Sequence, residues 1–407
     1  MLKSNKASLF LAYKSITRGN KGTLILTALL MTLAFVNLIF ISSIFLGMIT
    51  SMNEGSVDNE WSNIVVEPEE DEDYIKRVKS IQTLINSVPG VVSSSRHYII
   101  GAVESYDENK DGKGIKSTNR PIKSINPADE KQVTKIHQGM VAGKYLDKSD
   151  RNKILLGREV SGGYGANFEN EGLGGVQVGN KIKVLFSNGI EREYEVKGIF
   201  STKCIGADQL AFITEREMES VLGTHNMASE ILVKIDQTGQ EEEFIKIFRQ
   251  IGIVKEEIKP WTEYMGFITS VTKSFGMINL ILGTIGSIVA GITIFVIIFV
   301  NVTNKRMQIG ILKAIGIEEK IIVKSYILQA LFYVVLGVVL GLIITYSVIV
   351  PYFIKNPLDF PMGWVSLDVT KDNLVISSIS LIVAALAGGL IPAWRTSRES
   401  ILKAIWG

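Results

Sequence analysis

The chain has 407 residues, of which 46% are hydrophobic and 21% are charged, and it carries a net charge of +2 with a mean hydropathy of +0.25. This composition is too apolar for an ordinary soluble protein and too charged for a protein that lies wholly inside a membrane. It therefore indicates a membrane part joined to a soluble part. The single cysteine, Cys204, excludes a disulfide within the chain.

The first segment, residues 1–21, contains lysines and an arginine but no acidic residue. Leu9, Ala12, Tyr13 and Ile16 recur at helical spacing among these basic residues. This pattern predicts a cytoplasmic amphipathic helix that lies on the inner membrane surface. The alternative is a solvated basic tail, but the spaced apolar residues argue against it.

Four runs contain no Asp, Glu, Lys or Arg, at residues 22–53, 274–304, 325–354 and 373–394. Each run is longer than the roughly 20 residues that a helix needs to cross a bilayer. Buried helices of soluble proteins rarely stay apolar over such lengths. The sequence therefore predicts four transmembrane helices, the first at 22–53 and the other three within 274–394.

Basic residues gather in three segments that flank the spans, at 1–21, 303–324 and 395–407, whereas the loop 355–372 has two lysines against three aspartates. Short flanks rich in Lys and Arg stay on the cytosolic side of a membrane. If the spans alternate in direction, all three basic segments lie on that side. We therefore expect a multi-pass protein of the cell (cytoplasmic or inner) membrane with cytosolic N- and C-termini.

The segment between the first two spans, residues 54–273, is expected to lie outside and to form one large α+β domain or two small ones. A strand–helix–strand order occurs at its start and again near its end, with short strands and glycine turns between. The strands are expected at 63–66, 91–106, 153–156, 181–186, 192–200, 210–213 and 231–235, and the helices at 71–87, 215–222 and 240–251. The fold class is thus an α-helical membrane protein with a βαβ-type extracytoplasmic domain, which carries a β-rich insertion, between helices 1 and 2.

The sequence lacks the motifs of the common catalytic sites. No Gly-x-x-x-x-Gly-Lys-(Ser/Thr) phosphate loop, His-Glu-x-x-His or Gly-x-Ser-x-Gly occurs, and His97, His137 and His225 are scattered. The spans contain no acidic or basic residue that would mark an ion path. We therefore expect no enzyme, no ATP bound by this chain, no ion-coupled transporter and no nucleic-acid partner.

One short stretch has the pattern that begins a calcium loop. Asp107, Asn109 and Asp111 would supply oxygen ligands and Gly112 the sharp turn. Thr118 stands where the usual glutamate would complete the site. An ordinary polar surface turn is the alternative, so calcium is a weak hypothesis.

Small residues recur four apart within the spans, as at sites of close helix packing. The predicted packing positions are Gly286, Ala290, Gly337, Gly341, Ala384 and Gly388. Four helices are too few to line a large pore, so self-association is expected.

The stretch 304–316, between two spans, reads Asn-Lys-Arg-Met-Gln-Ile-Gly-Ile-Leu-Lys-Ala-Ile-Gly. Apolar Met307, Ile311, Leu312 and Ile315 are spaced for one side of a helix, and cations lie beside them. The stretch is either a short basic connector at the membrane surface or a helix that docks on a cytosolic partner.

From Ile309 to Gly316 this stretch closely resembles the cytoplasmic segment of FtsX/MacB-like ABC transporter permeases, although Gln308 stands where that family usually has glutamate. The approach to the first span and the tail 391–398 resemble the same family. Ser400 and Ile401 replace the family's usual Asp-Pro. The outer domain, coupling segment 303–324 and tail follow in the family's order.

The resemblance implies a permease subunit, with a MacB-like periplasmic core domain, that forms a homodimer or heterodimer with a second permease in membrane lipid. A separate ABC ATPase subunit would hold ATP and Mg²⁺ and drive movement of the outer domain, for export or extraction of a lipid, lipoprotein, peptide or drug. The expected ATPase contacts are Arg306, Gln308, Ile309, Leu312, Lys313 and Ile315, with Arg395 and Arg398 as weaker candidates. Leu312→Asp should uncouple ATP hydrolysis and leave the fold intact.

Two other functions stay open. The chain could act as an FtsX-like regulator that moves its outer domain to switch an extracellular hydrolase or adaptor and transports nothing. It could also be a membrane-anchored receptor or enzyme without an ATPase, although the coupling segment argues against this.

Overall fold

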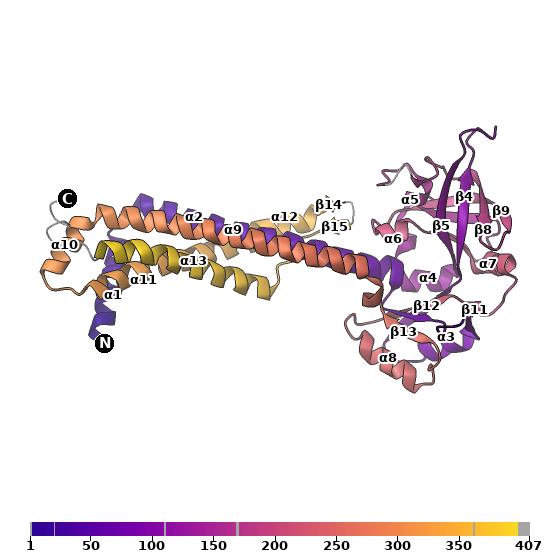
Figure 1. The fold of residues 1–407 in the computed structure, drawn as a ribbon, viewed down its shortest axis with the longest axis horizontal. Coiled ribbons are helices and arrows are strands. Elements are labelled where there is room, and N and C mark those ends of the chain that lie inside the picture. Colours follow the sequence, from indigo (N-terminus) through magenta and orange to yellow (C-terminus); the bar gives the residue numbers. More distant parts are fainter. Residues whose placement is uncertain (1, 20, 110, 168–170, 361–362, 398–407) are drawn as a thin grey trace. The chain divides into compact units, whose positions relative to one another are not determined.

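The computed structural model describes residues 2–19, 21–109, 111–167, 171–360 and 363–397 (Figure 1). The chain divides into two compact units. The membrane unit consists of Met1–Ile49, Val271–Leu358 and Val365–Gly407, and the outer unit consists of Thr50–Ser270 and Asp359–Trp364.

The described part of the membrane unit contains four helices that are long and apolar enough to cross a membrane. They are α2 (Lys21–Ser56), α9 (Gly266–Asn304), α11 (Glu319–Ile344) with its continuations η5 (Thr345–Ile349) and α12 (Val350–Lys355), and α13 (Lys371–Ser397). The predicted fold class, four such helices plus a large inserted α+β domain, is confirmed. The first helix runs beyond residue 53 into the π-helix η1 (Val57–Trp61), because extending a helix forms one more hydrogen bond for each residue that is fixed.

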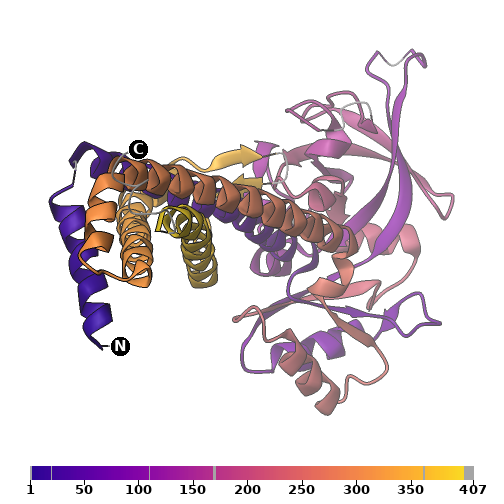
Figure 2. The same cartoon turned by 60° about the vertical axis from the view of Figure 1, so that its left-hand side comes forward.

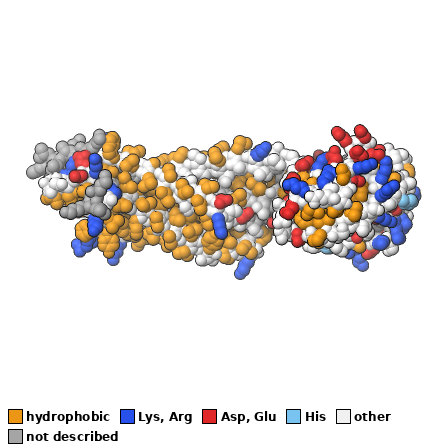
Figure 3. Space-filling view, turned by 90° about the horizontal axis from the view of Figure 1, so that it is seen from below, with side chains coloured by type: hydrophobic (Ala, Val, Ile, Leu, Met, Phe, Trp, Pro, Cys, Tyr) orange, Lys and Arg blue, Asp and Glu red, His pale blue; other side chains and the backbone are white. Residues whose placement is uncertain are grey.

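Two further helices lie at one end of the membrane unit, and Figure 2 shows them beside each other. They are α1 (Leu2–Thr17) and α10 (Arg306–Ala314). Side-chain hydrogen bonds join α1 to α11: Ser15 Oγ donates to Gln329 Oε1 at 3.1 Å, and Lys324 Nζ donates to Asn5 Oδ1 at 2.6 Å. Hydrophobic side chains cover most of the visible surface of the membrane helices in Figure 3.

Small residues let the membrane helices approach closely. A Cβ atom on Gly337 of α11 would lie 2.5 Å from Met31 Cβ of α2, and one on Gly388 of α13 would lie 2.2 Å from the carbonyl oxygen of Gly291 in α9. Neither position has room for a larger residue. The other predicted packing positions also lie at helix contacts: Gly341 faces Phe35, Gly286 faces Leu38, Ala290 is buried, and Ala384 contacts Gly291.

The outer unit contains a four-stranded antiparallel sheet in the order β13-β1-β12-β3. Its strands are β13 (Glu257–Pro260), β1 (Ile64–Glu67), β12 (Glu230–Ile235) and β3 (Val91–His97), and its core also includes apolar side chains of α3 (Val78–Asn86) and α8 (Glu241–Gln250). A small pair, β2 (Ile75–Lys76) with β11 (Met227–Ala228), precedes α3. The expected helix at 71–87 was therefore too long: Ile75 pairs with Ala228 in a strand, and Arg77 in the left-handed region separates it from α3.

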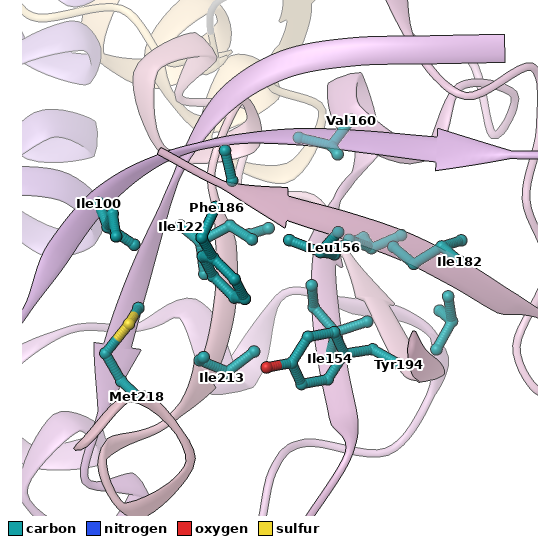
Figure 4. Packing of buried hydrophobic residues seen from close by; sticks show 14 of the residues in the cluster. Ile100, Ile122, Ile154, Leu156, Val160, Ile182, Phe186, Tyr194, Ile213 and Met218 are labelled. Atoms are coloured by element: carbon teal, nitrogen blue, oxygen red, sulfur yellow. The ribbon is translucent and has the colours of Figure 1, made fainter. Parts of the chain in front are cut away.

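The second sheet has seven strands in the order β6-β9-β7-β10-β5-β4-β8. They are β4 (Ile99–Tyr106), β5 (Lys116–Ile125), β6 (Met140–Gly143), β7 (Lys153–Gly157), β8 (Lys181–Phe186), β9 (Glu191–Phe200) and β10 (Ala211–Thr214). Because β8 also pairs with β9, the sheet closes on itself around the apolar side chains in Figure 4. The β-rich insertion thus forms a closed barrel.

Short elements complete the described structure. They are α4 (Pro127–Val133), η2 (Ile136–Gln138), α5 (Arg158–Ser161), α6 (Ile205–Asp208), α7 (Glu215–Leu222), η4 (Trp261–Tyr264) and the hairpin strands β14 (Leu358–Phe360) and β15 (Gly363–Val365). The expected strand at 91–106 is two strands in different sheets, with the buried Tyr98 between them.

A buried cluster of charges lies where β3 leaves one sheet and β4 enters the other. His97 Nε2 is 2.6 Å from Glu130 Oε2, and His97 Nδ1 is 2.9 Å from Glu230 Oε1. Lys123 Nζ is also 2.9 Å from Glu230 Oε1. Burial alone lowers the pKa of His97, but Glu130 and Glu230 raise it to about 9. Burial opposes ionisation of Glu230, but Lys123 and His97 lower its pKa to about 2. The two acids and two bases therefore neutralise each other.

This cluster makes the stability of the outer unit depend on pH. The raised pKa of His97 gives stability that is full below its ordinary pKa of 6.5 and is lost as the pH rises through about 9. The lowered pKa of Glu230 gives stability that is full above 4.5 and is lost as the pH falls through about 2. The protection of β3 and β12 against hydrogen exchange in the full chain, corrected for the intrinsic pH dependence of amide exchange, should be greatest between pH 4.5 and 6.5. His97→Gln should destabilise the unit by about 3–5 kcal/mol, because it removes the cation that faces the buried carboxylate of Glu130. The exposed His225→Gln is the control, and equal effects of both variants would contradict the prediction.

Gly337→Ala should weaken the contact between α11 and α2 by about 1–3 kcal/mol, because the added methyl group overlaps Met31. Gly276→Ala in α9 is the matched control, since nothing lies within 4 Å of its Cβ position. Both changes remove the same intrinsic helix cost of glycine, so the difference reports the contact. Thermal unfolding in one detergent measures it, and equal midpoints would refute close packing at Gly337.

Candidate functional site

The helix α10 lies between two membrane helices and is bounded by residues with special backbone geometry. Lys305, with φ −103° and ψ 12°, separates it from α9. Gly316 has φ +92°, a left-handed conformation that glycine adopts without strain, and its N–H donates to the carbonyl of Lys313. The long apolar helix α11 then begins at Glu319.

One side of α10 packs on the membrane helices. Ile309 is 3% exposed, Gly310 is buried, and Leu312 is half-buried against the same apolar cluster, which also includes Ile322 and Tyr326. The expected ATPase contacts at Ile309 and Leu312 stay predictions. Because Leu312 packs partly against this cluster, Leu312→Asp would disturb the packing as well as any docking.

The opposite side of α10 presents apolar side chains to the surface. Met307 is 58% exposed, Ile311 is 47% exposed and Ile315 is 70% exposed. These residues are four apart, so they form a line along the helix, and Gln308 is exposed beside them. We call Met307, Gln308, Ile311 and Ile315 the docking stripe. Met307 and Ile311 were not among the expected contacts, although their spacing placed them with Ile315.

The cations near the docking stripe have different surroundings. Lys313 Nζ is 2.9 Å from Glu319 Oε1, which directs this side chain toward the start of α11. Arg306 is half-buried at the first turn of α10. Arg395 is exposed in the last described turn of α13, and Arg398 lies outside the described residues. The accessible part of the site is therefore mainly apolar.

A groove of about 1210 Å³ lies within the membrane unit, between α2, α9 and α13. Its walls are mostly apolar, as at Leu280, Ile292 and Val383, with a few polar groups. Ser42 Oγ donates to Asn279 Oδ1 at 2.9 Å on one wall. Such a surface suits an amphiphilic molecule or another apolar helix.

In the suspected calcium loop, side-chain oxygens accept hydrogen bonds from backbone N–H groups of the same loop. Asp107 Oδ2 accepts a hydrogen bond from the Gly112 N–H at 2.8 Å, and Asp111 Oδ1 accepts one from the Lys113 N–H at 2.8 Å. Asn109 lies in the same bend. No group of three or more His, Cys, Asp or Glu among the described residues could hold a metal ion. Calcium binding here stays a prediction.

Residues 280–401 match the family described as FtsX-like permease C-terminal. The chain is 27% identical over 160 residues to the ABC transporter permease YtrF of Bacillus subtilis, covering 34% of this chain and 36% of YtrF. It is 22% identical over 259 residues to the permease protein HrtB of Staphylococcus haemolyticus, whose name refers to a hemin transport system, covering 63% of this chain and 68% of HrtB. The match thus spans about a third of the length of YtrF.

Two solved structures align with part of this chain, each with a TM-score below 0.5. The extracellular domain of the noncanonic ABC-type transporter YknZ from Gram-positive bacteria has a TM-score of 0.34 and 13% identity, covering 49% of this chain and 97% of that one. The periplasmic region of MacB from Actinobacillus actinomycetemcomitans has a TM-score of 0.36 and 12% identity, covering 54% of this chain and 97% of that one.

Aspartate should lower the stability of the protein much more on the buried side of α10 than on its exposed side. Ile309→Asp buries a charge without a partner and should cost several kcal/mol of stability. Ile315→Asp introduces the charge on an exposed position and should change stability by less than about 0.5 kcal/mol. Thermal unfolding of both full-length variants in one detergent compares them. A similar loss in both would show that Ile315 is part of the core.

Proposed function

From the premise that residues 280–401 belong to the FtsX-like permease family, we propose that this chain is the permease subunit of an ABC transporter. It couples ATP hydrolysis by a separate ATPase subunit, docked on α10, to movement of its extracytoplasmic domain. The movement exports or extracts an amphiphile such as a lipid, lipoprotein, peptide or drug. Both termini lie in the cytosol, and a second permease, identical or different, completes the transporter.

The observation that carries the proposal is the docking stripe on one side of a helix whose other side packs against the membrane helices. Exposed apolar groups in a row favour association with another protein surface. The buried Ile309 on the other side holds α10 against the membrane helices, so a partner that moves α10 also moves them. A loose basic connector would provide neither the apolar contact nor the fixed support.

The path from α10 toward the outer unit also supports coupling. Only Lys305 separates α10 from α9, and α9 continues as one helix from Asn304 back to Gly266. Every residue of such a helix is held by backbone hydrogen bonds. Displacement at one end is therefore transmitted along α9 more directly than a flexible linker would allow.

The groove between α2, α9 and α13 supports the class of cargo. Its apolar walls would accept an acyl chain or an apolar ring system, and its few polar groups would orient the polar part. Hemin, to which the name of HrtB refers, is one amphiphile of this kind. The apolar walls of the same groove are also a surface on which a helix of the second permease would pack.

The double variant Met307→Asp/Ile315→Asp should lose the ATPase subunit during copurification from native membranes. Two charges in an apolar contact remove most of its binding energy, so affinity should fall at least about tenfold. ATP hydrolysis should no longer respond to the permease. Val254→Asp adds a charge at an equally exposed apolar position of the outer unit and is the matched control.

Two results would contradict the proposal. One is copurification of the double variant with the same amount of ATPase as the wild type. The other is the absence of any phosphate-loop ATPase from the wild-type preparation, under detergent conditions that keep a known ABC complex intact.

A further inference from the structure

A basic pocket lies between α1, α10 and α11, on the side of α10 that faces α1. Its volume is about 470 Å³. Lys14 of α1, Arg18, which directly follows α1, and Lys305 contribute positive charge to it. Polar and apolar side chains complete its lining, and none of them is acidic: Leu11, Ser15, Gln308, Ile309, Ile311, Leu312, Ile322, Ser325, Tyr326 and Gln329.

The pocket leaves its cations without a carboxylate among the described residues. Lys305 Nζ donates to Ser15 Oγ at 2.5 Å, and Ser15 Oγ donates in turn to Gln329 Oε1 at 3.1 Å. These are neutral partners. Burial lowers the pKa of Lys305, and no negative neighbour among the residues that the structure describes opposes this effect. A bound anion would supply the negative charge that these neutral partners lack.

The position of the pocket matches the level of lipid headgroups. Lys305 directly follows α9, at the cytosolic end of its apolar run, and Ser325 begins the apolar run of α11. The outer face of α1 exposes Leu9, Phe10 and Tyr13, as a helix lying in the membrane interface does. Cations and apolar surface therefore occur together at a depth where phosphate groups are abundant.

We propose that this pocket binds the phosphate headgroup of an anionic phospholipid. The phosphate oxygens accept hydrogen bonds from Lys14, Arg18 and Lys305, and Gln308 and Gln329 supply further amide groups. The acyl chains follow the apolar surface beside α1. The lipid thereby joins α1 to the helix that carries the docking stripe. This inference rests on the proposed function only through the orientation that places α1 and α10 on the cytosolic side.

The test measures lipid bound to the full-length chain by native mass spectrometry, with dioleoylphosphatidylglycerol and dioleoylphosphatidylcholine as probes. The wild type should retain phosphatidylglycerol in preference to phosphatidylcholine. Arg18→Gln and Lys305→Gln should each reduce the amount of phosphatidylglycerol that stays bound roughly fivefold, since one cation near an anionic headgroup contributes about that factor to the affinity. Lys6→Gln, on an exposed part of α1 outside the pocket, is the matched control and should change nothing. Arg18 is exposed at the end of α1, so its substitution leaves the fold intact.

Several outcomes would overturn the proposal. The first is equal retention of phosphatidylglycerol by the wild type and the Arg18→Gln/Lys305→Gln double variant. Binding of inorganic phosphate by a wild type that retains no phosphatidylglycerol would assign the pocket to free phosphate. If the Arg18→Gln/Lys305→Gln variant loses the ATPase subunit while its lipid binding is unchanged, the pocket would instead bind an acidic segment of that subunit. Ile315→Asp, which lies outside the pocket, should keep the lipid even where ATPase docking fails, so the two proposals fail separately.

Discussion

The burial of Ile309 against the membrane helices is the contact on which the cytosolic end of the molecule depends. Burying one such side chain contributes about 1.5–3 kcal/mol, enough to hold a nine-residue helix that would not be stable alone. It fixes the rotation of α10 and so turns Met307, Ile311 and Ile315 outward. The same rotation brings Gln308 and Ile311 to the wall of the basic pocket. One apolar contact thus positions both the docking stripe and the lipid pocket.

The membrane helices against which Ile309 packs are themselves closely packed on one another. At Gly337 the backbone of α2 lies where a side chain would be, and at Gly388 the backbone of α9 does. Without a hydrophobic driving force inside a bilayer, dispersion contacts at such crossings contribute much of the association energy. The helices are therefore closely packed at these crossings, as a device that transmits movement requires.

The sequence was sufficient for features that depend on local pattern. Long runs without charge predict spans, and residues four apart predict the line of apolar groups on α10. The sequence was insufficient where contacts between distant residues decide the secondary structure or the partner of a side chain. Ile75 was expected in a helix, but pairing with Ala228 draws it into a strand. His97 meets Glu230 across 133 positions of sequence, and Lys305 meets Ser15 across 290. Ile309 and Ile311 differ by two positions, yet only packing against α11 shows which is buried.

The two groups of buried or half-buried cations differ in how their charge is compensated. In the outer unit His97 and Lys123 meet Glu130 and Glu230, so the cluster is complete and serves to join two sheets. Within the part of the chain that the structure describes, the ammonium group of Lys305 meets a serine hydroxyl and no carboxylate. Taking a cation partly out of water without a negative partner is unfavourable. An incomplete charge group that persists beside a cavity is better explained by a ligand that completes it, and at this depth the abundant anion is the phosphate of a lipid.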